Sequence, residues 1–186
     1  MTLIAWRPCA SALHGEQSAA ARALLSDLLR QAGQCKAEIV RTETGRPYFK
    51  ECPWLDFSLS HTTGLVVCAL AVGAGAGVAP RVGVDVESPV NEEKAVRLAN
   101  RFFQPAEKEY LRASGDIPRA FAEIFTAKEA YGKYLGDGLA VHLGDDTARA
   151  DFAENAKIWF FRYRVGGYCI TLCQSKGLPP PEIVAL

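Results

Sequence analysis

Residues 65–87 read LVVCALAVGAGAGVAPRVGVDVE, and this stretch decides how the chain is organised. Leu65 to Val72 is a continuous apolar run, which is typical of a buried strand. Gly73 to Pro80 is a connector rich in glycine and alanine, and a second predicted strand, Arg81 to Glu87, follows it. We therefore expect the chain to divide near residue 80 into two parts.

Elements of mixed type are predicted on both sides of this connector. The part before it has predicted strands at 2–6, 39–40, 48–49 and 57–60 and a helix with an apolar stripe at about 17–31. The part after it has predicted helices at about 92–101, 105–113 and 118–135, and strands at 157–165 and 168–173 that Gly166-Gly167 joins as a hairpin. This order lacks a regular strand–helix alternation, so we predict an α+β fold with a largely antiparallel sheet.

The composition is that of a soluble globular protein of 186 residues, enough for one domain or two small halves that share a core. Its 21 Lys and Arg residues balance 21 Asp and Glu residues, which disfavours a generic nucleic-acid binder or a polybasic membrane-surface protein. The six cysteines form no CxxC pair, which argues against a zinc site. Because we find no signal peptide and no run of about eighteen apolar residues, we expect a reduced, cytoplasmic protein.

Two carboxylates lie on the predicted strand after the connector. Successive side chains of a strand point to opposite faces, so Asp85 and Glu87 share one face while the valines between and beside them share the other. Neighbouring carboxylates repel each other unless a cation lies between them, and Mg²⁺ prefers oxygen ligands of this kind. The alternative is a strand edge whose acidic face is simply solvated.

A second cluster lies in the long predicted helix, where residues 125–133 read FTAKEAYGK. Phe125, Glu129 and Lys133 recur at i, i+4 and i+8 and share roughly one face, with Lys128 on its flank. One carboxylate and two ammonium groups on a semi-buried helix suit an anionic ligand that is bound with a metal. The alternative is an ordinary Glu–Lys pair that supports a surface helix.

A third cluster, Ser58 to His61, lies where a predicted strand ends in a loop. Hydroxyl and imidazole groups at such a rim can donate hydrogen bonds to phosphate oxygens. A nucleophilic Ser60–His61 pair is a poor alternative, because sequence neighbours rarely point at each other and no glycine elbow surrounds the serine. A histidine that merely satisfies a local polar group is the other alternative.

Taken in order, these segments resemble the motifs of 4′-phosphopantetheinyl transferases of the surfactin-synthetase-activating type. The matching segments are Gly45-Arg46-Pro47, Phe57–His61, Gly83–Glu87 and Phe125–Lys133, and Arg101–Phe103 with Glu107–Leu111 resembles the family's segment between the last two. The resemblance implies two similar α+β halves related by a pseudo-twofold axis, with the active site in the cleft between them. Residues 1–80 would hold the 3′-phosphate and adenine side of coenzyme A, and residues 81–186 the magnesium site and the docking surface for a carrier.

The resemblance also implies the reaction. The family transfers the 4′-phosphopantetheine arm of coenzyme A to a serine of an apo acyl or peptidyl carrier protein, with Mg²⁺, and releases 3′,5′-adenosine bisphosphate. Carried over to this chain, Asp85, Glu87 and Glu129 hold the metal, and Glu129 or a metal-bound water is the base. Lys128 and Lys133 bind phosphate, and Lys133 also stabilises charge on the leaving group, so Asp85, Glu129 and Lys133 form the expected catalytic set.

Further coenzyme A contacts are implied for the first half. His61 and Ser60 are expected at a phosphate, and Arg46 stands where the family more often has lysine and is expected at the 3′-phosphate or adenine. Arg22 is the best candidate for another 3′-phosphate contact, and Lys36 is a weaker one. Phe125 replaces a common tryptophan.

The expected partners are an acidic apo carrier and coenzyme A, with no nucleic acid and no membrane, and we expect a monomer. Residues 97–119 hold five basic and three acidic residues with two phenylalanines, which predicts a docking surface for the carrier. A solvated helix pair is the alternative for this segment. For the whole chain, the alternatives are a non-catalytic coenzyme A binding module of the same fold and a carboxylate–metal phosphodiesterase.

Overall fold

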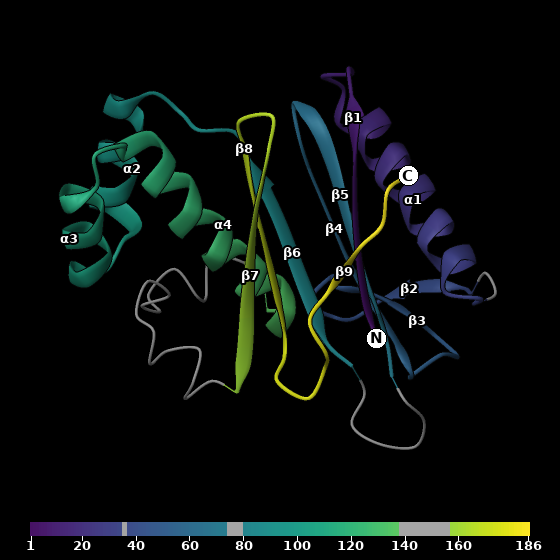
Figure 1. The fold of residues 1–186 in the computed structure, drawn as a ribbon. Helices are drawn as coiled ribbons and strands as arrows, with labels where there is room; N and C mark the ends of the chain where they lie inside the picture. The colour runs from purple at the N-terminus through teal and green to yellow at the C-terminus, as the bar shows by residue number, and fades with distance from the viewer. Residues whose placement is uncertain (35–36, 74–79, 138–156) are drawn as a thin grey trace.

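The structure is a computed structural model, and it describes residues 1–34, 37–73, 80–137 and 157–186 (Figure 1). The helices are α1 (His14–Gln31), α2 (Glu92–Phe102), α3 (Pro105–Ala113) and α4 (Ile117–Leu135). The strands are β1 (Thr2–Cys9), β2 (Ile39–Arg41), β3 (Pro47–Phe49), β4 (Leu55–Thr62), β5 (Gly64–Val72), β6 (Val82–Glu87), β7 (Ile158–Val165), β8 (Tyr168–Ser175) and β9 (Glu182–Ile183). In these ranges no helix is long and apolar enough to cross a membrane.

The first sheet has the strand order β4-β5-β1-β9, and α1 packs on one of its faces. Strand β5 pairs antiparallel with both neighbours, as its continuous apolar sequence predicts for a central strand. Leu24, Leu25 and Leu28 of α1 are buried against Phe57 and Leu70 of this sheet. Strand β9 returns from the end of the chain to pair parallel with β1, so the first sheet contains residues from both parts of the sequence.

The second sheet has the order β6-β8-β7 and is antiparallel throughout. Helix α4 lies against β6 and β8, while α2 and α3 pack on the first half of α4, at the end of the molecule far from α1 (Figure 1). Sequence signals at the helix ends explain their limits. The Asn91 side chain accepts a hydrogen bond from Lys94 N at the start of α2, and Gly136 ends α4 in the left-handed conformation at φ 87°.

One apolar core joins the two sheets. Ile4 and Val67 of the first sheet are buried with Val84, Ile170 and Leu172 of the second. The layers therefore follow the order α1, first sheet, second sheet, α4.

The edge strands β4 and β6 are also tied together by side chains of β4. Val82 N donates to Asp56 Oδ2 at 2.8 Å, and Val84 N donates to Ser58 Oγ at 2.9 Å. These two bonds fix the position of β6, which carries the predicted acidic pair, relative to β4.

The predicted α+β class and antiparallel pairing are confirmed, and the hairpin at Gly166-Gly167 forms with both glycines at positive φ. The strand predicted at 57–60 is longer than expected, so the loop after it begins later. His61 and Thr62 continue β4, and the chain turns at Thr63 and Gly64, where φ is 96°. The helix predicted from Gln17 begins earlier, at His14. The pseudo-twofold relation and the boundary at residue 80 stay predictions.

Candidate active site

Gly83 allows α4 to approach β6 closely enough to bring two of the motifs together. A Cβ atom at this position would lie 2.0 Å from the carbonyl oxygen of Ala130 and 2.5 Å from the backbone nitrogen of Tyr134. Neither backbone atom can move without displacing the helix, so only glycine fits here. The glycine of the predicted strand is thus the reason that the acidic face of β6 meets the helix face of Glu129 and Lys133.

Asp85 and Lys133 form the centre of this contact. Lys133 Nζ lies 2.7 Å from Asp85 Oδ1, and it also donates to Ser60 Oγ at 2.8 Å and to the carbonyl oxygen of Val84 at 3.1 Å. The Ser60 hydroxyl donates in turn to the same Asp85 oxygen at 2.7 Å. One carboxylate oxygen therefore accepts two hydrogen bonds, one of them from a cation, in a setting where Asp85 is buried.

The negative charge of Asp85 raises the pKa of two further carboxylates, Glu87 and Glu129. Burial first, and the negative charge of Asp85 second, raise the pKa of Glu87 to about 7, although the Lys133 ammonium and a hydrogen bond from Thr62 oppose this. The pKa of Glu129 is raised to about 7 by burial, by Asp85 and by Glu87, again against Lys133. The charge of Asp85 thus makes ionisation of both glutamates less favourable.

These three carboxylates are chemically suited to bind a divalent cation, but in this structure they are not close enough together to bind one ion. Asp85 Oδ2 is buried and has no hydrogen-bond partner in the described part of the chain, so this oxygen is available to a further ligand. Carboxylate oxygens are what Mg²⁺ prefers, and a cation would relieve the repulsion that raises the two glutamate pKa values. In the four described ranges, however, no three His, Cys, Asp or Glu side chains are gathered closely enough to hold a metal. Binding would have to draw Glu87 and Glu129 toward Asp85.

A cavity of about 590 Å³ adjoins this centre on the side of the first sheet. Its walls come from α1, the β2–β3 hairpin, β4 and the last turns of α4. Four of the predicted coenzyme A ligands line it together: Arg22, Arg46, His61 and Lys133. Lys133 therefore belongs both to the cavity and to the acidic centre, and it connects the two.

Arg46 lines this cavity and also joins three of the surrounding elements by hydrogen bonds. Its guanidinium donates to Asp56 Oδ2 at 2.7 Å and to the carbonyl oxygens of Lys133 and Val82 at 3.0 and 3.2 Å. Thr44 Oγ1 donates to the carbonyl oxygen of Gly136 at 2.7 Å. The β2–β3 turn thereby satisfies carbonyl groups that every helix C-terminus leaves without partners, and it attaches the first half of the chain to α4.

Asp56 is a functional residue that sequence reasoning missed, and a signal for it was present. Asp56, Ser58 and Ser60 alternate along β4, so all three side chains point to one face. On that face Asp56 binds Arg46, Ser58 binds Val84 N, and Ser60 binds Asp85. Arg41 and Thr44, which also line the cavity, had no comparable signal.

Lys128 requires a correction, because the structure does not place it with the other predicted coenzyme A ligands. Its side chain is fully buried, and Nζ lies 2.8 Å from Glu107 Oε1, which is also fully buried. The ammonium lies 5.9 Å from the centre of the Phe103 ring. Lys128 thus points toward α3, while Glu129 and Lys133 face β6. In this structure Lys128 pairs with Glu107 where α4 packs on α3.

Ser60 also differs from the prediction. Its hydroxyl is buried and bonded to Asp85 and Lys133, so it orients the acidic centre instead of lining the cavity wall.

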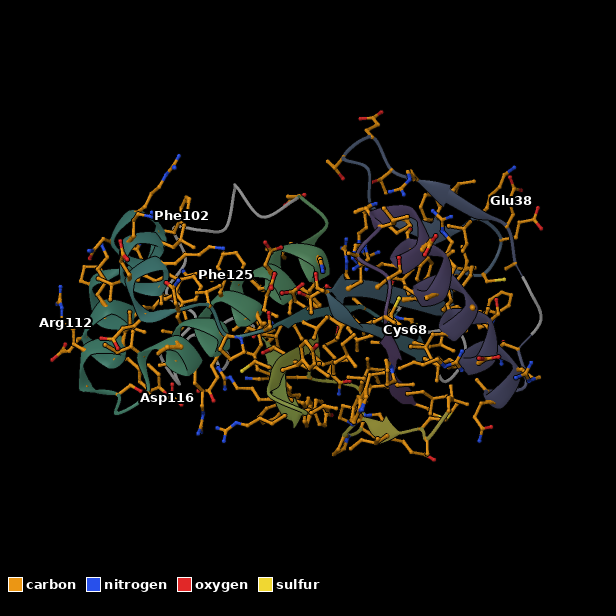
Figure 2. The ribbon with its side chains drawn as sticks, turned by 90° about the horizontal axis from the view of Figure 1, so that it is seen from above. Glu38, Cys68, Phe102, Arg112, Asp116 and Phe125 are labelled. Atoms are coloured by element: carbon orange, nitrogen blue, oxygen red, sulfur yellow. The ribbon has the colours of Figure 1, made fainter. Side chains whose placement is uncertain are left out.

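Lys36 lies outside the described residues. Of the predicted docking segment, Arg97, Arg101 and Arg112 are exposed and Phe103 is buried. Figure 2 shows Phe102 and Arg112 at the end of the molecule opposite Glu38.

Comparison with known proteins bears on this arrangement. A sequence model of the 4′-phosphopantetheinyl transferase superfamily matches residues 81–173, which is half of the chain. The chain is 27% identical over 138 residues to a 4′-phosphopantetheinyl transferase of Bacillus subtilis, covering 69% of this chain and 58% of that protein. It is 37% identical over 86 residues to the 4′-phosphopantetheinyl transferase HetI of Nostoc sp., covering 45% of this chain and 34% of HetI.

A third relative carries a different name. The chain is 48% identical over 50 residues to a holo-[acyl-carrier-protein] synthase of Azoarcus sp., covering 27% of this chain and 40% of that protein. The chain thus spans between about a third and three fifths of the length of these three relatives. The family match includes β6 and α4, the two elements that Gly83 brings together. The chain therefore belongs to the 4′-phosphopantetheinyl transferase superfamily.

Proposed function

We propose that this chain transfers the 4′-phosphopantetheine arm of coenzyme A to a serine of an apo acyl or peptidyl carrier protein. The observation that carries the proposal is the position of Lys133, which lines a cavity with Arg22, Arg46 and His61 and also contacts Asp85. Cations in a cavity of about 590 Å³ suit a phosphorylated ligand, and carboxylates at its edge suit chemistry on a phosphate group.

The proposed reaction is a displacement at phosphorus. The serine oxygen of the carrier forms a bond to the β-phosphorus of the coenzyme A pyrophosphate, and the bond from that phosphorus to the bridging oxygen breaks. Glu129 accepts the serine proton, and Lys133 stabilises the charge that develops on the departing 3′,5′-adenosine bisphosphate.

Asp85, Glu87 and Glu129 are the residues that we propose to hold Mg²⁺. The metal would supply neutralisation of pyrophosphate charge. The support is that Asp85 Oδ2 is buried without a hydrogen-bond partner among the described residues, and that the charge of Asp85 raises the pKa of both glutamates. His61 and Arg22 are proposed to contact phosphate groups from the far wall of the cavity.

The carrier is proposed to dock on the segment from Arg97 to Arg119. Arg97, Arg101 and Arg112 are exposed there, and Arg101 lies 4.9 Å from the ring centre of Phe102. Such a mixture of cations and aromatic groups suits an acidic partner. We also propose the surfactin-synthetase-activating subtype, two related halves with the site at their junction, and a monomer that acts in the cytoplasm without nucleic acid or membrane.

The function is tested by incubating the protein with coenzyme A, Mg²⁺ and several apo carriers, and then weighing the carriers by mass spectrometry. We expect a phosphopantetheine mass gain on at least one carrier and release of 3′,5′-adenosine bisphosphate. Coenzyme A binding without a mass gain on any carrier would instead favour a non-catalytic binding module. Hydrolysis of coenzyme A without a carrier would favour a phosphodiesterase.

A further inference from the structure

Helix α1 presents a polar stripe toward the proposed coenzyme A cavity. Ser18 and Arg22 line the cavity and lie four residues apart, so they are on the same face of the helix. His14 lies four residues before Ser18, on the same stripe, and it is the first residue of α1. The stripe therefore continues one turn past the residues that line the cavity.

His14 contacts the cavity wall through His61. The centres of the two imidazole rings are 4.8 Å apart and their planes meet at 79°, an edge-to-face arrangement. His61 lines the cavity, so a residue of α1 packs against a side chain of the cavity wall. Neither the motifs nor the spacing of the sequence predicted this pair.

The beginning of α1 is attached to the end of β4, which keeps the two histidines together. The buried Gln17 side chain donates to the carbonyl oxygen of Ser11 at 2.9 Å and to that of Thr62 at 3.4 Å. Thr62 follows His61 directly in the sequence. The hydrogen bond from Gln17 to Thr62 therefore fixes the backbone that carries His61 relative to the start of α1. The pair is a defined part of the fold.

We propose that His14 is a further binding residue for the phosphate groups of coenzyme A, acting beside His61 and positioning its ring. The inference rests on the proposed function, since that function supplies the anionic ligand. His14 is exposed in the free protein, and an imidazole N–H can donate a hydrogen bond to a phosphate oxygen. The two rings would then approach the ligand from two different elements, α1 and β4.

The charged groups that face the pair support this role. Burial, the positive charge of His14 and that of Lys133 lower the pKa of His61, while the carboxylate of Asp85 acts in the opposite direction. Arg22 lies on the same stripe of α1, two turns from His14. The free protein therefore resists protonation of His61, and an anionic ligand would reduce that resistance.

The test compares wild type with His14→Phe and His14→Ala by calorimetric titration with coenzyme A between pH 5.5 and 8.5. Phenylalanine keeps an edge-to-face ring contact but neither donates a hydrogen bond nor protonates. We expect His14→Phe to weaken coenzyme A binding about three- to tenfold. Arg30→Ala removes an exposed cation from the other end of α1 and should leave binding unchanged.

NMR titration of the His61 ring without ligand should give a higher pKa in His14→Phe, because one source of repulsion is lost.

Each result decides between the two proposals. If His14→Phe binds coenzyme A like wild type at every pH, the inference is overturned, whether or not carriers are modified. If binding weakens as expected but no carrier gains mass, the inference stands and the proposed transfer fails. Wild-type protein that does not bind coenzyme A would overturn both. A further outcome is that His14→Ala binds coenzyme A more weakly than wild type while His14→Phe binds it equally well. His14 would then have only a packing role, which would overturn the inference.

Discussion

The ammonium group of Lys133 lies 2.7 Å from the carboxylate of Asp85, although the two residues are 48 positions apart and belong to different elements. Lys133 is partly exposed and faces the cavity, whereas Asp85 is buried. The pair therefore connects a cavity lined by cations with a carboxylate whose charge raises the pKa values of Glu87 and Glu129. A phosphate group bound at Lys133 would lie beside the carboxylates that we propose as metal ligands.

The first prediction concerns stability against pH in the absence of metal. Because the pKa values of Glu87 and Glu129 are raised from 4.5 to about 7 in the folded protein, folding favours their protonated forms. Their contribution to stability is complete below about pH 4.5 and is lost as the pH rises through about 7. Urea unfolding in EDTA should show this decrease. Mg²⁺ should restore stability at pH 7.5, and no response to Mg²⁺ would speak against the metal site.

The second prediction uses Asp85→Asn, which keeps the shape of the side chain and removes its charge. Asp85 is the second-largest cause of the raised pKa of both glutamates, so this variant should lower both pKa values. The pH window in which metal-free stability decreases should then shift to lower pH. The same urea titrations measure the shift, and an unchanged window would show that Asp85 does not couple to the two glutamates.

A third prediction follows from the close approach of β6 and α4. Gly83→Ala introduces a methyl group that would overlap the backbone of α4, so we expect a loss of more than about 2 kcal/mol in the free energy of unfolding. Coenzyme A binding should weaken because Lys133 moves with the helix. Gly115→Ala is the matched control, since nothing lies within 4 Å of a Cβ atom there. Equal stability of the two variants would refute the packing argument.

The fourth prediction separates Lys128 from Lys133. Lys128→Met leaves the buried carboxylate of Glu107 without its cation, which should reduce the free energy of unfolding by about 3–5 kcal/mol. The double variant Lys128→Met/Glu107→Leu removes both buried charges and should recover part of that loss, since it also removes the acceptor for Gln104 N at the start of α3. Affinity for coenzyme A, measured on the folded double variant, should equal that of wild type. A large loss of affinity in the double variant would return Lys128 to the set of phosphate ligands.

Much of the fold followed from local sequence signals. The apolar run of β5, the acidic alternation of β6 and the glycines of the β7–β8 hairpin each have a physical cause that acts within a few residues. Helix α3 forms at the predicted limits, Pro105 to Ala113, because Pro105 can begin a helix and Glu107 accepts a hydrogen bond from Gln104 N.

The rest depended on contacts between distant segments, which no local pattern specifies. Helical spacing placed Lys128 beside the functional face of α4, but its direction is set by Glu107 of α3, twenty-one positions earlier. His14 comes to His61 only because α1 packs on the first sheet. The role of Arg46 in binding the end of α4 likewise requires the β2–β3 turn to reach the other half of the chain.

The most direct measurement is the single-turnover rate of phosphopantetheine transfer to an apo carrier at saturating coenzyme A and Mg²⁺. Wild type, Lys133→Met and Lys128→Met/Glu107→Leu should be compared, with each rate normalised to folded protein. We predict that Lys133→Met is at least about 100-fold slower than wild type, because the group that neutralises the leaving phosphate is lost. The double variant should react at close to the wild-type rate. Transfer by Lys133→Met at the wild-type rate would contradict the central claim, that Lys133 joins the cavity to the carboxylates that we propose as catalytic.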